Sequence, residues 1–571
     1  MPSKTIRNGT VADAYLALLA DRGVDYFFGN AGTDFAPIIE SFAKAAATGT
    51  PAPKPMLVPH ENLALHMALG YYAVSGKPQV VMVHVNAGTA NAMCGLINAG
   101  KGNLPVIFTS GRTPYAETGD AIGLRNREVH WSQEMRDQAA MVREIVKWDY
   151  ELRGKDVLEV AVDRALNIAM TEPRGPVYMT LPREPLAEEI DEFTFDSPSR
   201  RQTPTAPWPD PAAIDQAAEI LAKAENPLIV AGNSGSNAEN VRALASLAER
   251  FALPVTPRKS LYLCLPSNHP MQLGLDSDPY LDAADAIVVL DCDVPWIPSV
   301  KAPSPDCKII HIGADPGFSS YPIRGYAADL AITGETGATL RLLEEAMSAH
   351  EGGARDRIEA RRVRVAAEWQ RLRDDWRATV EKVKDQTPIH PAWLAHCIDQ
   401  VKGEDAILVS EARVPLTQFT LTQPGSFLAF GAGGGLGHGL GVALGAKLAS
   451  PDRLVICTQG DGAYMYGNPV AAHYVSKAEK LPFLTVMHNN REWGAVKRNT
   501  RAIYPDGYAA KSNREPLTFF DHGIEFEHTV RTAGGYGEMV EDPAKLPKAL
   551  EKAVDMVMTD GRQAMLNVIS S

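Results

Sequence analysis

Short apolar runs alternate with helical patterns along almost the whole chain. In the first part, helical patterns such as Glu61–Val74 and Thr89–Ala99 lie between the apolar runs Val24–Gly29, Met56–Pro59, Gln79–Val85, Pro105–Ser110 and Val177–Leu181. Continuous apolar strands separated by helices are typical of parallel sheets that are covered on both faces. The pattern therefore predicts an α/β fold.

Two further blocks repeat this alternation after a Pro-rich linker at Ser197–Pro211. The apolar runs of these blocks are Leu228–Ala231, Ala286–Leu290 and Lys308–Ile312, and then Ala406–Val409, Phe427–Phe430, Leu454–Thr458, Phe483–His488 and Ala564–Ile569. We predict three consecutive doubly wound parallel-sheet domains over residues 1–196, 211–350 and 386–571. A charged connector helix over residues 351–385 joins the last two.

Composition restricts the class of protein. The 571 residues are 45% hydrophobic and 22% charged, which is ordinary for a globular chain, and the formal charge of −13 argues against nucleic acid as a partner. No apolar run approaches the ~18 residues that span a bilayer. The N-terminus lacks a signal-peptide core and is interpreted as a capped amphipathic helix, and the six cysteines as buried thiols. We expect a cytoplasmic protein without a membrane partner.

Two polar clusters in the third block suggest a metal-bound phosphate. One buried strand ends at Gly460-Asp461-Gly462, followed by Ala463, and the next ends at Asn489-Asn490. In a parallel sheet, ligands bind beyond the C-terminal ends of the strands. Glycine lets backbone N–H groups approach phosphate oxygens, and carboxylate and amide oxygens suit Mg²⁺. The first cluster alone could be a tight turn, but the pair of clusters favours a binding site.

A glycine-rich segment, Phe430–Gly437, follows another short strand of this block. Its glycines would let a flat ring lie against the backbone, and the bulky Leu436 could wedge a cofactor into a bent shape. By itself the segment could equally be the glycine-rich start of a helix.

These motifs together resemble the thiamine diphosphate (ThDP) enzymes of the 2-oxo acid decarboxylase and acetolactate synthase superfamily, especially the benzoylformate decarboxylase-like members. The resemblance implies pyrimidine-binding, middle and diphosphate-binding domains. It also implies that Mg²⁺ is held by Asp461, Asn490 and the Glu492 carbonyl, and the diphosphate by Gly460, Gly462 and Ala463. Leu436 would support the bent cofactor, and the Gly434 carbonyl would contact its aminopyrimidine.

The resemblance also assigns a role to Glu61, which opens a helix in the first block. An acid in a first helical turn is often only a favourable partner for the helix dipole. ThDP enzymes, however, place a glutamate here that shares a proton with the pyrimidine ring. In that family the glutamate lies in an apolar cleft, and desolvation of a carboxyl group favours such proton sharing.

The candidate substrate residues resemble those of two different groups of ThDP enzymes. Thr33 and His84 match the hydroxyl residue and the histidine of benzoylformate decarboxylases, although His84 could also be a structural histidine. Gln133, Glu134 and the neighbouring His130 lie in a segment that resembles acetolactate synthases. Lys497 and Arg498 could bind a substrate carboxylate or form a solvated helix face. The second histidine of benzoylformate decarboxylase has no counterpart in the segment Asp293–Pro298.

The resemblance implies decarboxylation of a small-molecule 2-oxo acid to an enamine, followed by release of an aldehyde or ligation to a second carbonyl. An acetolactate synthase-like carboligase, a non-decarboxylating carbon–carbon lyase or hydrolase, and a non-catalytic relative that binds a nucleotide-like ligand remain alternatives. A flavin or ADP in the middle domain lacks support, because Gly232–Ser236 is too short to be a persuasive phosphate motif.

The resemblance also bears on assembly, because Glu61 and the Asp461 motif lie in different blocks. In this superfamily the first domain of one subunit and the third domain of its partner enclose the cofactor. The implied active unit is an obligatory homodimer, which would pair into a homotetramer.

Overall fold

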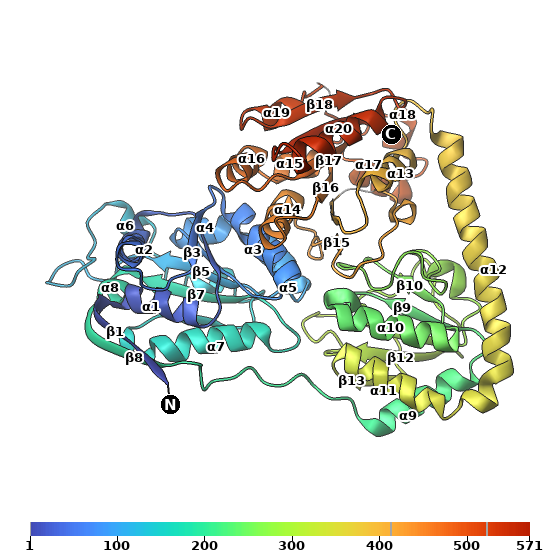
Figure 1. Ribbon diagram of the computed structural model, residues 1–571, viewed down its shortest axis with the longest axis horizontal. Coiled ribbons are helices and arrows are strands. Elements are labelled where there is room, and N and C mark those ends of the chain that lie inside the picture. The colour runs from blue at the N-terminus through green and yellow to red at the C-terminus, as the bar shows by residue number, and fades with distance from the viewer. Residues whose placement is uncertain (1, 412–413, 521–522) are drawn as a thin grey trace.

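Three parallel β-sheets with helices packed against them make up the protein (Figure 1). The computed structural model describes residues 2–411, 414–520 and 523–571. The strand order is β3-β2-β4-β5-β7-β6 in the first sheet, β10-β9-β11-β12-β13 in the second and β15-β14-β16-β17-β19-β18 in the third. This architecture confirms the predicted α/β class.

The first sheet is buried on both faces because its strands are continuously apolar. Along β4, Val81 and Val83 face one hydrophobic cluster, and Val80 and Met82 face the other. The strands are β2 (Tyr26–Gly29), β3 (Lys54–Leu57), β4 (Val80–Val83), β5 (Ile107–Arg112), β6 (Asp149–Glu151) and β7 (Val177–Pro182). The helices are α1 (Val11–Asp21), α2 (Ala36–Thr48), α3 (Glu61–Ser75), α4 (Val85–Asn91), α5 (Met93–Lys101), α6 (Val129–Ser132), α7 (Leu158–Met170) and α8 (Arg183–Ala187), with a 3₁₀ turn, η1, at Thr33–Phe35.

The N-terminus corrects one prediction, because its first residues form a strand rather than a helix. Strand β1 (Ser3–Thr10) pairs antiparallel with β8 (Glu189–Asp196). The helix begins only at Val11, where Thr10 and Asp13 form a reciprocal capping box. The partner of β1 lies far away in the sequence, so no local pattern reveals the pairing.

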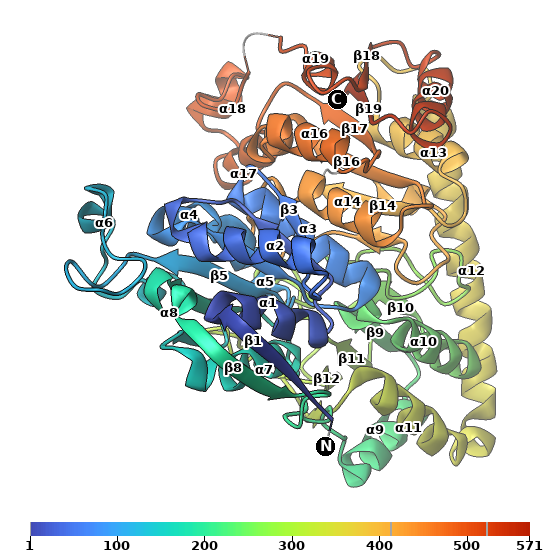
Figure 2. The ribbon, with the colours of Figure 1, turned by 60° about the vertical axis from the view of Figure 1, so that its left-hand side comes forward.

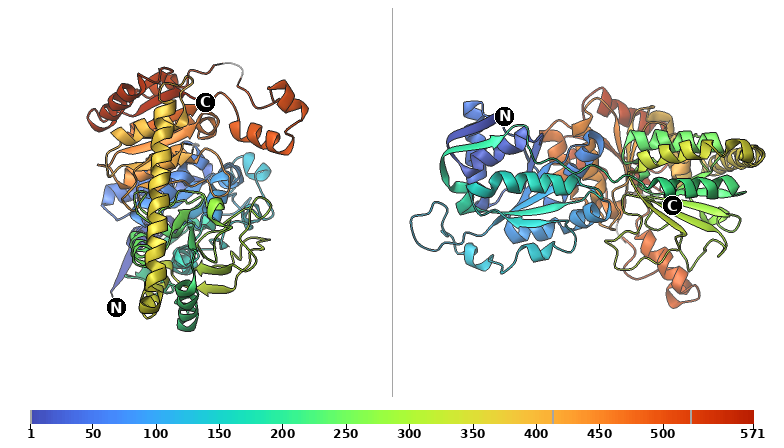
Figure 3. Two further views of the ribbon diagram at one scale, coloured as in Figure 1. Left: turned by 90° about the vertical axis from the view of Figure 1, so that its right-hand side faces the viewer. Right: turned by 90° about the horizontal axis from the view of Figure 1, so that it is seen from below.

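The middle sheet consists of β9 (Pro227–Ala231), β10 (Val255–Pro257), β11 (Ala286–Leu290), β12 (Lys308–Gly313) and β13 (Leu330–Thr333), with α9 (Pro211–Lys223), α10 (Ala238–Phe251) and α11 (Thr336–Ser348) against it. The long helix α12 (Glu351–Val383) runs along the side of the molecule and joins the second sheet to the third (Figure 3). It is anchored by Arg361, whose buried guanidinium donates to the carbonyls of Ala224 and Phe251.

The third sheet consists of β14 (Ile407–Glu411), β15 (Phe427–Leu428), β16 (Val455–Gly460), β17 (Leu484–Asn489), β18 (Tyr536–Val540) and β19 (Ala564–Ile569). Its helices are α13 (Pro391–Val401), α14 (His438–Ala449), α15 (Asp461–Tyr466), α16 (Pro469–Ala478), α17 (Gly494–Ile503), α18 (Tyr508–Ser512), α19 (Glu527–Arg531) and α20 (Leu546–Met558). The first and third sheets follow the same order, so α3 and α14 occupy equivalent positions in the two units.

Helices α3 and α14 pack against each other and join the first unit to the third (Figures 1 and 2). Glycines allow the close approach. A Cβ on Gly445 would lie 2.1 Å from the Met67 carbonyl oxygen, and a Cβ on Gly70 would lie 2.2 Å from the Val442 carbonyl oxygen. The two backbones therefore touch where they cross.

The sequence also predicted that no segment spans a membrane and that the cysteines are buried. In the part of the chain that the structure describes, no helix has the length and apolar character needed to cross a bilayer. Five cysteines are buried, as expected, but Cys94 on α5 is exposed.

Candidate active site

The first and third sheets each have a topological switch point, where the connections that follow two adjacent strands lead in opposite directions. In the first sheet this point lies between β2 and β4, and in the third between β14 and β16. Such points form the ligand crevices of open α/β sheets. His84 directly follows β4, and Asp461 directly follows β16. These two predicted residues therefore lie at the carboxyl ends of strands beside the switch points.

Asp461 is the buried acid of the third edge, with a relative exposure of 3%. One of its carboxylate oxygens accepts from the Gly462 N–H and the other from the Arg491 N–H, both at 2.8 Å. Burial raises the pKa of the Asp461 carboxyl to about 6. In the described part of the chain, no basic nitrogen lies within 4.0 Å of it. Among the described residues, the carboxylate therefore lacks a positive partner.

Asn490 and Glu492 lie beside this acid, just beyond β17. The Asn490 side-chain oxygen accepts from the Glu492 N–H at 3.3 Å. The Glu492 carboxylate pairs with Lys497 at 2.7 Å, and its backbone carbonyl accepts from the Gly494 N–H at 2.9 Å. Lys497, a predicted candidate for a substrate carboxylate, is thus engaged with Glu492.

The glycine-rich segment lies in an open position before α14. Gly434 is exposed and has a φ of 75°, and the Leu436 side chain is 40% exposed although it is large and apolar. Asn98 of α5 fixes the segment from the first unit. Its side-chain oxygen accepts from the N–H groups of Gly433 and Gly435, and its amide donates to the Gly435 carbonyl at 2.8 Å.

This donor set fits a divalent cation and a diphosphate. Mg²⁺ takes oxygen ligands of the kinds found here, namely a carboxylate, an amide oxygen and a backbone carbonyl. Gly460 has open space where a Cβ would be, so a ligand can approach its backbone. The large apolar side chain of Leu436 is 40% exposed and so is available to support a ligand.

Glu61 starts α3, shortly after strand β3 of the first unit. The Asn91 side-chain amide donates to its carboxylate at 2.5 Å and also lies 3.4 Å from the His60 ring. The Asn468 amide lies 3.3 Å from the other nitrogen of the His60 ring. Asn468 belongs to the turn between α15 and α16, so the region of Glu61 contacts the third unit of the same chain.

His84 connects two other polar residues of the first edge. Its Nδ1 lies 2.5 Å from an oxygen of Asp34, and its Nε2 lies 3.1 Å from the side-chain nitrogen of Gln133. Asp34 raises the pKa of His84 through this hydrogen bond, with a further contribution from the charge of Glu61. His84 and Glu61 therefore belong to one electrostatic environment.

Of the other predicted substrate residues, some make no hydrogen bond to His84 or Glu61. Thr33 starts η1 and is exposed, and its carbonyl accepts from Arg183 at 3.4 Å. His130 is buried, and its Nδ1 accepts from the Asn126 N–H; burial, together with neighbouring arginines, lowers the pKa of its ring. Glu134 accepts from Arg125 and from the Thr113 hydroxyl. Of the Gln133–Glu134 pair, only Gln133 contacts His84.

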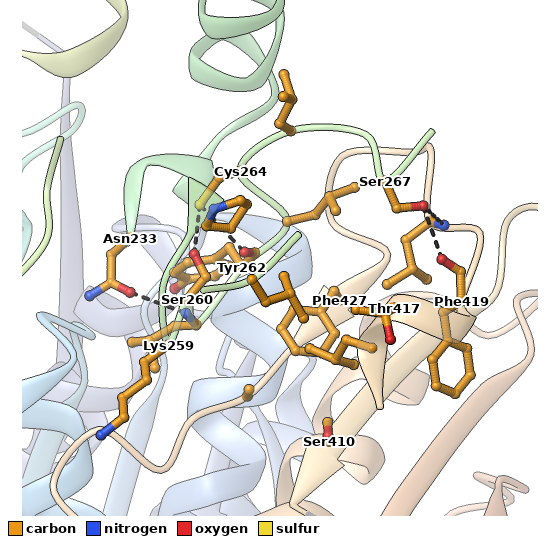
Figure 4. Close-up of a pocket in the computed structure, with 18 of the residues that line it drawn as sticks. Asn233, Lys259, Ser260, Tyr262, Cys264, Ser267, Ser410, Thr417, Phe419 and Phe427 are labelled. Atoms are coloured by element: carbon orange, nitrogen blue, oxygen red, sulfur yellow. Dashed lines mark hydrogen bonds between the residues drawn. The ribbon is translucent and has the colours of Figure 1, made fainter. Parts of the chain in front are cut away.

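A cavity of about 980 Å³ lies between the middle sheet and the third sheet (Figure 4). It reaches Gly434 and His438 of the glycine-rich segment and α14. Aromatic side chains line much of it, namely Tyr262, Phe318, Tyr321, Trp369, Trp376, Phe419 and Phe427. Arg373 lies 4.1 Å from the Trp369 ring centre, and burial lowers the pKa of its guanidinium to about 10. The segment that lacks the second histidine contributes Asp293, which accepts from the Tyr321 hydroxyl.

Several polar residues of the site were not predicted. Asp34, Asn91 and Asn98 lie in segments whose neighbours were selected, but a single polar residue on an apolar stretch gives no pattern of its own. Glu411 accepts from the N–H groups of Gly437 and Gly439 and so fixes the start of α14. Glu411 is the last residue of β14, a strand beside the switch point of the third sheet. That position is the signal from which it could have been predicted as a site residue.

Protein-family models match three parts of the chain. Models of the thiamine pyrophosphate enzymes match residues 9–141 as the N-terminal TPP binding domain, 214–343 as the central domain and 411–568 as the C-terminal TPP binding domain. Benzoylformate decarboxylase from Pseudomonas aeruginosa is 28% identical over 503 residues, covering 86% of this chain and 87% of that protein. A probable acetolactate synthase large subunit from Methanocaldococcus jannaschii is 26% identical over 573 residues, covering 95% and 89%.

A solved structure shows the same fold over nearly the whole length. The ThDP-dependent 4-hydroxybenzoylformate decarboxylase from Rhodococcus jostii RHA1 has a TM-score of 0.75 at 22% identity, with 99% of each chain covered. The family models together match most of the chain, with two of them describing TPP-binding domains. The chain therefore belongs to the thiamine pyrophosphate enzymes, within the family that contains the ThDP-dependent decarboxylases and carboligases.

Proposed function

We propose that the protein decarboxylates a 2-oxo acid with ThDP and Mg²⁺ and releases an aldehyde, as the name benzoylformate decarboxylase implies for its relative. One observation supports this most strongly. Glu61 and His84 lie within electrostatic reach of each other at the edge of the first unit, where they can divide two proton-handling roles. The remaining cofactor residues lie on the third unit.

The division of roles follows from position. When bound, ThDP supplies the electron sink that decarboxylation of a 2-oxo acid requires. Asp461, Asn490 and the Glu492 carbonyl would hold Mg²⁺, while Gly460, Gly462 and Ala463 would lie along the diphosphate. Glu61 would hold a proton on its carboxyl group against the pyrimidine ring, beside the Gly434 carbonyl and the Leu436 side chain. His84 would hold and deliver a proton on the substrate side, near the Thr33 hydroxyl.

The cavity beside Gly434 supports a substrate with a large apolar group, which in the proposed dimer would meet the first domain of the other subunit there. Its aromatic lining suits a flat or branched side chain, and Lys101, Lys259 and Arg373 bring positive charge to it. In the described residues no carboxylate lies within 4.0 Å of these three cations. An anionic 2-oxo acid would match both properties.

A carboligase resembling acetolactate synthase is the second candidate, and the contact of Gln133 with His84 favours it. In such an enzyme the same decarboxylation would be followed by addition to a second carbonyl compound. A lyase or hydrolase that does not decarboxylate would cleave its substrate without releasing CO₂.

A panel of 2-oxo acids that includes pyruvate and benzoylformate tests these candidates. The protein is supplied with ThDP and Mg²⁺, and CO₂ and organic products are read by mass spectrometry. We expect CO₂ with an aldehyde from an aromatic substrate, whereas a branched hydroxy acid would indicate the carboligase. The Glu61→Ala variant should still bind ThDP but lose activity by at least about a hundred-fold. Unchanged turnover in that variant would remove the catalytic assignment.

The quaternary structure is part of the proposal. We infer a homodimer, and further a homotetramer, in which the first domain of one subunit faces the third domain of another. The contact between His60 and Asn468 shows that these domains also meet within one chain. The origin of the two halves of a site therefore needs its own experiment.

A further inference from the structure

Asp34 is a buried acid at the switch point of the first sheet, with a relative exposure of 4%. It lies in η1, which follows β2, whereas His84 follows the neighbouring strand β4. One Asp34 oxygen is 2.5 Å from Nδ1 of His84. The other oxygen is buried and has no hydrogen-bond partner among the described residues. The carboxylate therefore directs its one strong contact at the histidine ring.

The surrounding backbone leaves space for this pair and for little else. A Cβ on Gly111, at the end of β5, would lie 1.6 Å from the unbonded Asp34 oxygen. A Cβ on Gly32 would lie 2.1 Å from Nδ1 of His84. Neither glycine has a positive φ, so glycine is needed at these positions because a side chain would not fit, and not because of the backbone conformation. Two separate segments of the chain thus make space for the same contact.

Gln133 contacts the opposite nitrogen of the ring at 3.1 Å. A side-chain amide can present either its NH₂ group or its oxygen. It can therefore donate to Nε2 when the ring is neutral and accept from Nε2–H when the ring is charged. Asp34 fixes the proton on Nδ1, and Gln133 tolerates either state of Nε2.

The charged groups around the pair are few. Asp34 from η1 and Glu61 from α3 face the ring, and together they favour its protonated form. Arg183 from α8 and His130 from α6 interact electrostatically with Asp34. A carboxylate that accepts from Nδ1–H orients an imidazole and stabilises the imidazolium that forms.

We propose that Asp34 is the positioning residue of the site: it holds His84 with Nδ1 protonated, so that Nε2 gives its proton to the substrate. This rests on the proposed function. The N–H bond at Nε2 breaks as the proton moves to the substrate, the ring retains its proton on Nδ1 beside Asp34, and a proton from water restores Nε2–H.

The test compares Asp34→Asn with wild type in the full-length holoenzyme. We expect kcat to fall about ten- to hundred-fold, with KM changed less than about three-fold and ThDP affinity unchanged by calorimetry. Removing the carboxylate lowers the pKa of His84, so the alkaline limb of the kcat profile should move to lower pH. Asp191→Asn, an exposed acid on β8, is the matched control and should behave as wild type.

A spectroscopic arm separates this proposal from the proposed function. In protein with ¹⁵N-labelled histidine, NMR should show His84 protonated at Nδ1 in wild type, and His84 should titrate about one pH unit or more lower in Asp34→Asn. This arm needs no substrate, so it holds even if no 2-oxo acid is turned over. A wild-type His84 without Nδ1–H, or equal titration and equal kcat in both proteins, would overturn the proposal. The wild-type spectrum decides the matter if the variant fails to fold.

Discussion

Replacing Asp461 by asparagine should make the metal-free protein more stable while removing its ability to bind the cofactor. Burial raises the pKa of Asp461 to about 6, whereas an aspartate in an unfolded chain titrates near 3.9. One pKa unit corresponds to about 1.36 kcal/mol, so the charged carboxylate costs the metal-free fold ~3 kcal/mol at neutral pH. Asparagine is close in shape to the neutral acid and does not incur this cost.

The sign of the pH dependence follows from the same shift. Because the folded pKa lies above the unfolded one, the stability contributed by protonation is fully present below about pH 4. It is lost as pH rises through about 6. The variant should therefore match wild type near pH 4 and exceed it at pH 7.5. For a unit the size of the third domain, ~3 kcal/mol corresponds to a Tm higher by about 5–10 °C.

Thermal unfolding in chelator-treated buffer at both pH values measures this difference. Asp560→Asn, at an exposed position of the same unit, should change Tm by little. Added Mg²⁺ and ThDP should raise the Tm of wild type but not that of Asp461→Asn. A metal-free Asp461→Asn protein that melts at or below the wild-type temperature at pH 7.5 would refute the reasoning.

Two further predictions concern how the domains meet. Inactive Glu61→Ala and Asp461→Ala chains should regain activity when they are mixed and refolded together, if each site combines two chains. One of the two sites in the mixed dimer then has both native residues. No recovery of activity would indicate that each site is made within one chain. Gly445→Ala should lower Tm, since its Cβ would lie 2.1 Å from the Met67 carbonyl oxygen and overpacking costs about 1–3 kcal/mol. Gly353→Ala in α12, with nothing within 4 Å, is the control; equal Tm values for the two variants would contradict the role of the crossing.

The sequence predicted the interior of the sheets well because buried parallel strands are continuous apolar runs. The run Ala286–Leu290 matches β11 in both bounds, and Ala564–Ile569 matches β19. Strands with little apolar content were missed, including β1, which pairs with distant β8, and the short edge strand β6. Pairing at an edge depends on tertiary contacts that a local pattern does not contain.

The candidate site residues selected from the sequence are those that belong to motifs. Glu61, His84 and Asp461 belong to motifs, and the structure places them at the edges of two sheets. Their supporting residues could not be predicted in this way. Asp34 contacts His84, and Asn98 donates to the Gly435 carbonyl. In both pairs the two residues are far apart in the sequence, so the sequence pattern does not show that they meet.

The equal strand order of the first and third sheets has a consequence for how such molecules assemble. Helices α3 and α14 present surfaces that complement each other whichever chain each comes from. The Pro-rich segment of residues 197–210 has no regular structure, and its 14 residues could reach roughly 45 Å when extended. A shift in the path of that tether would exchange partners between neighbouring molecules while preserving every contact at the helix crossing. The path of residues 197–210, rather than the side chains at the helix crossing, would then decide whether the first and third units of one chain pack together or pack with those of a neighbouring chain.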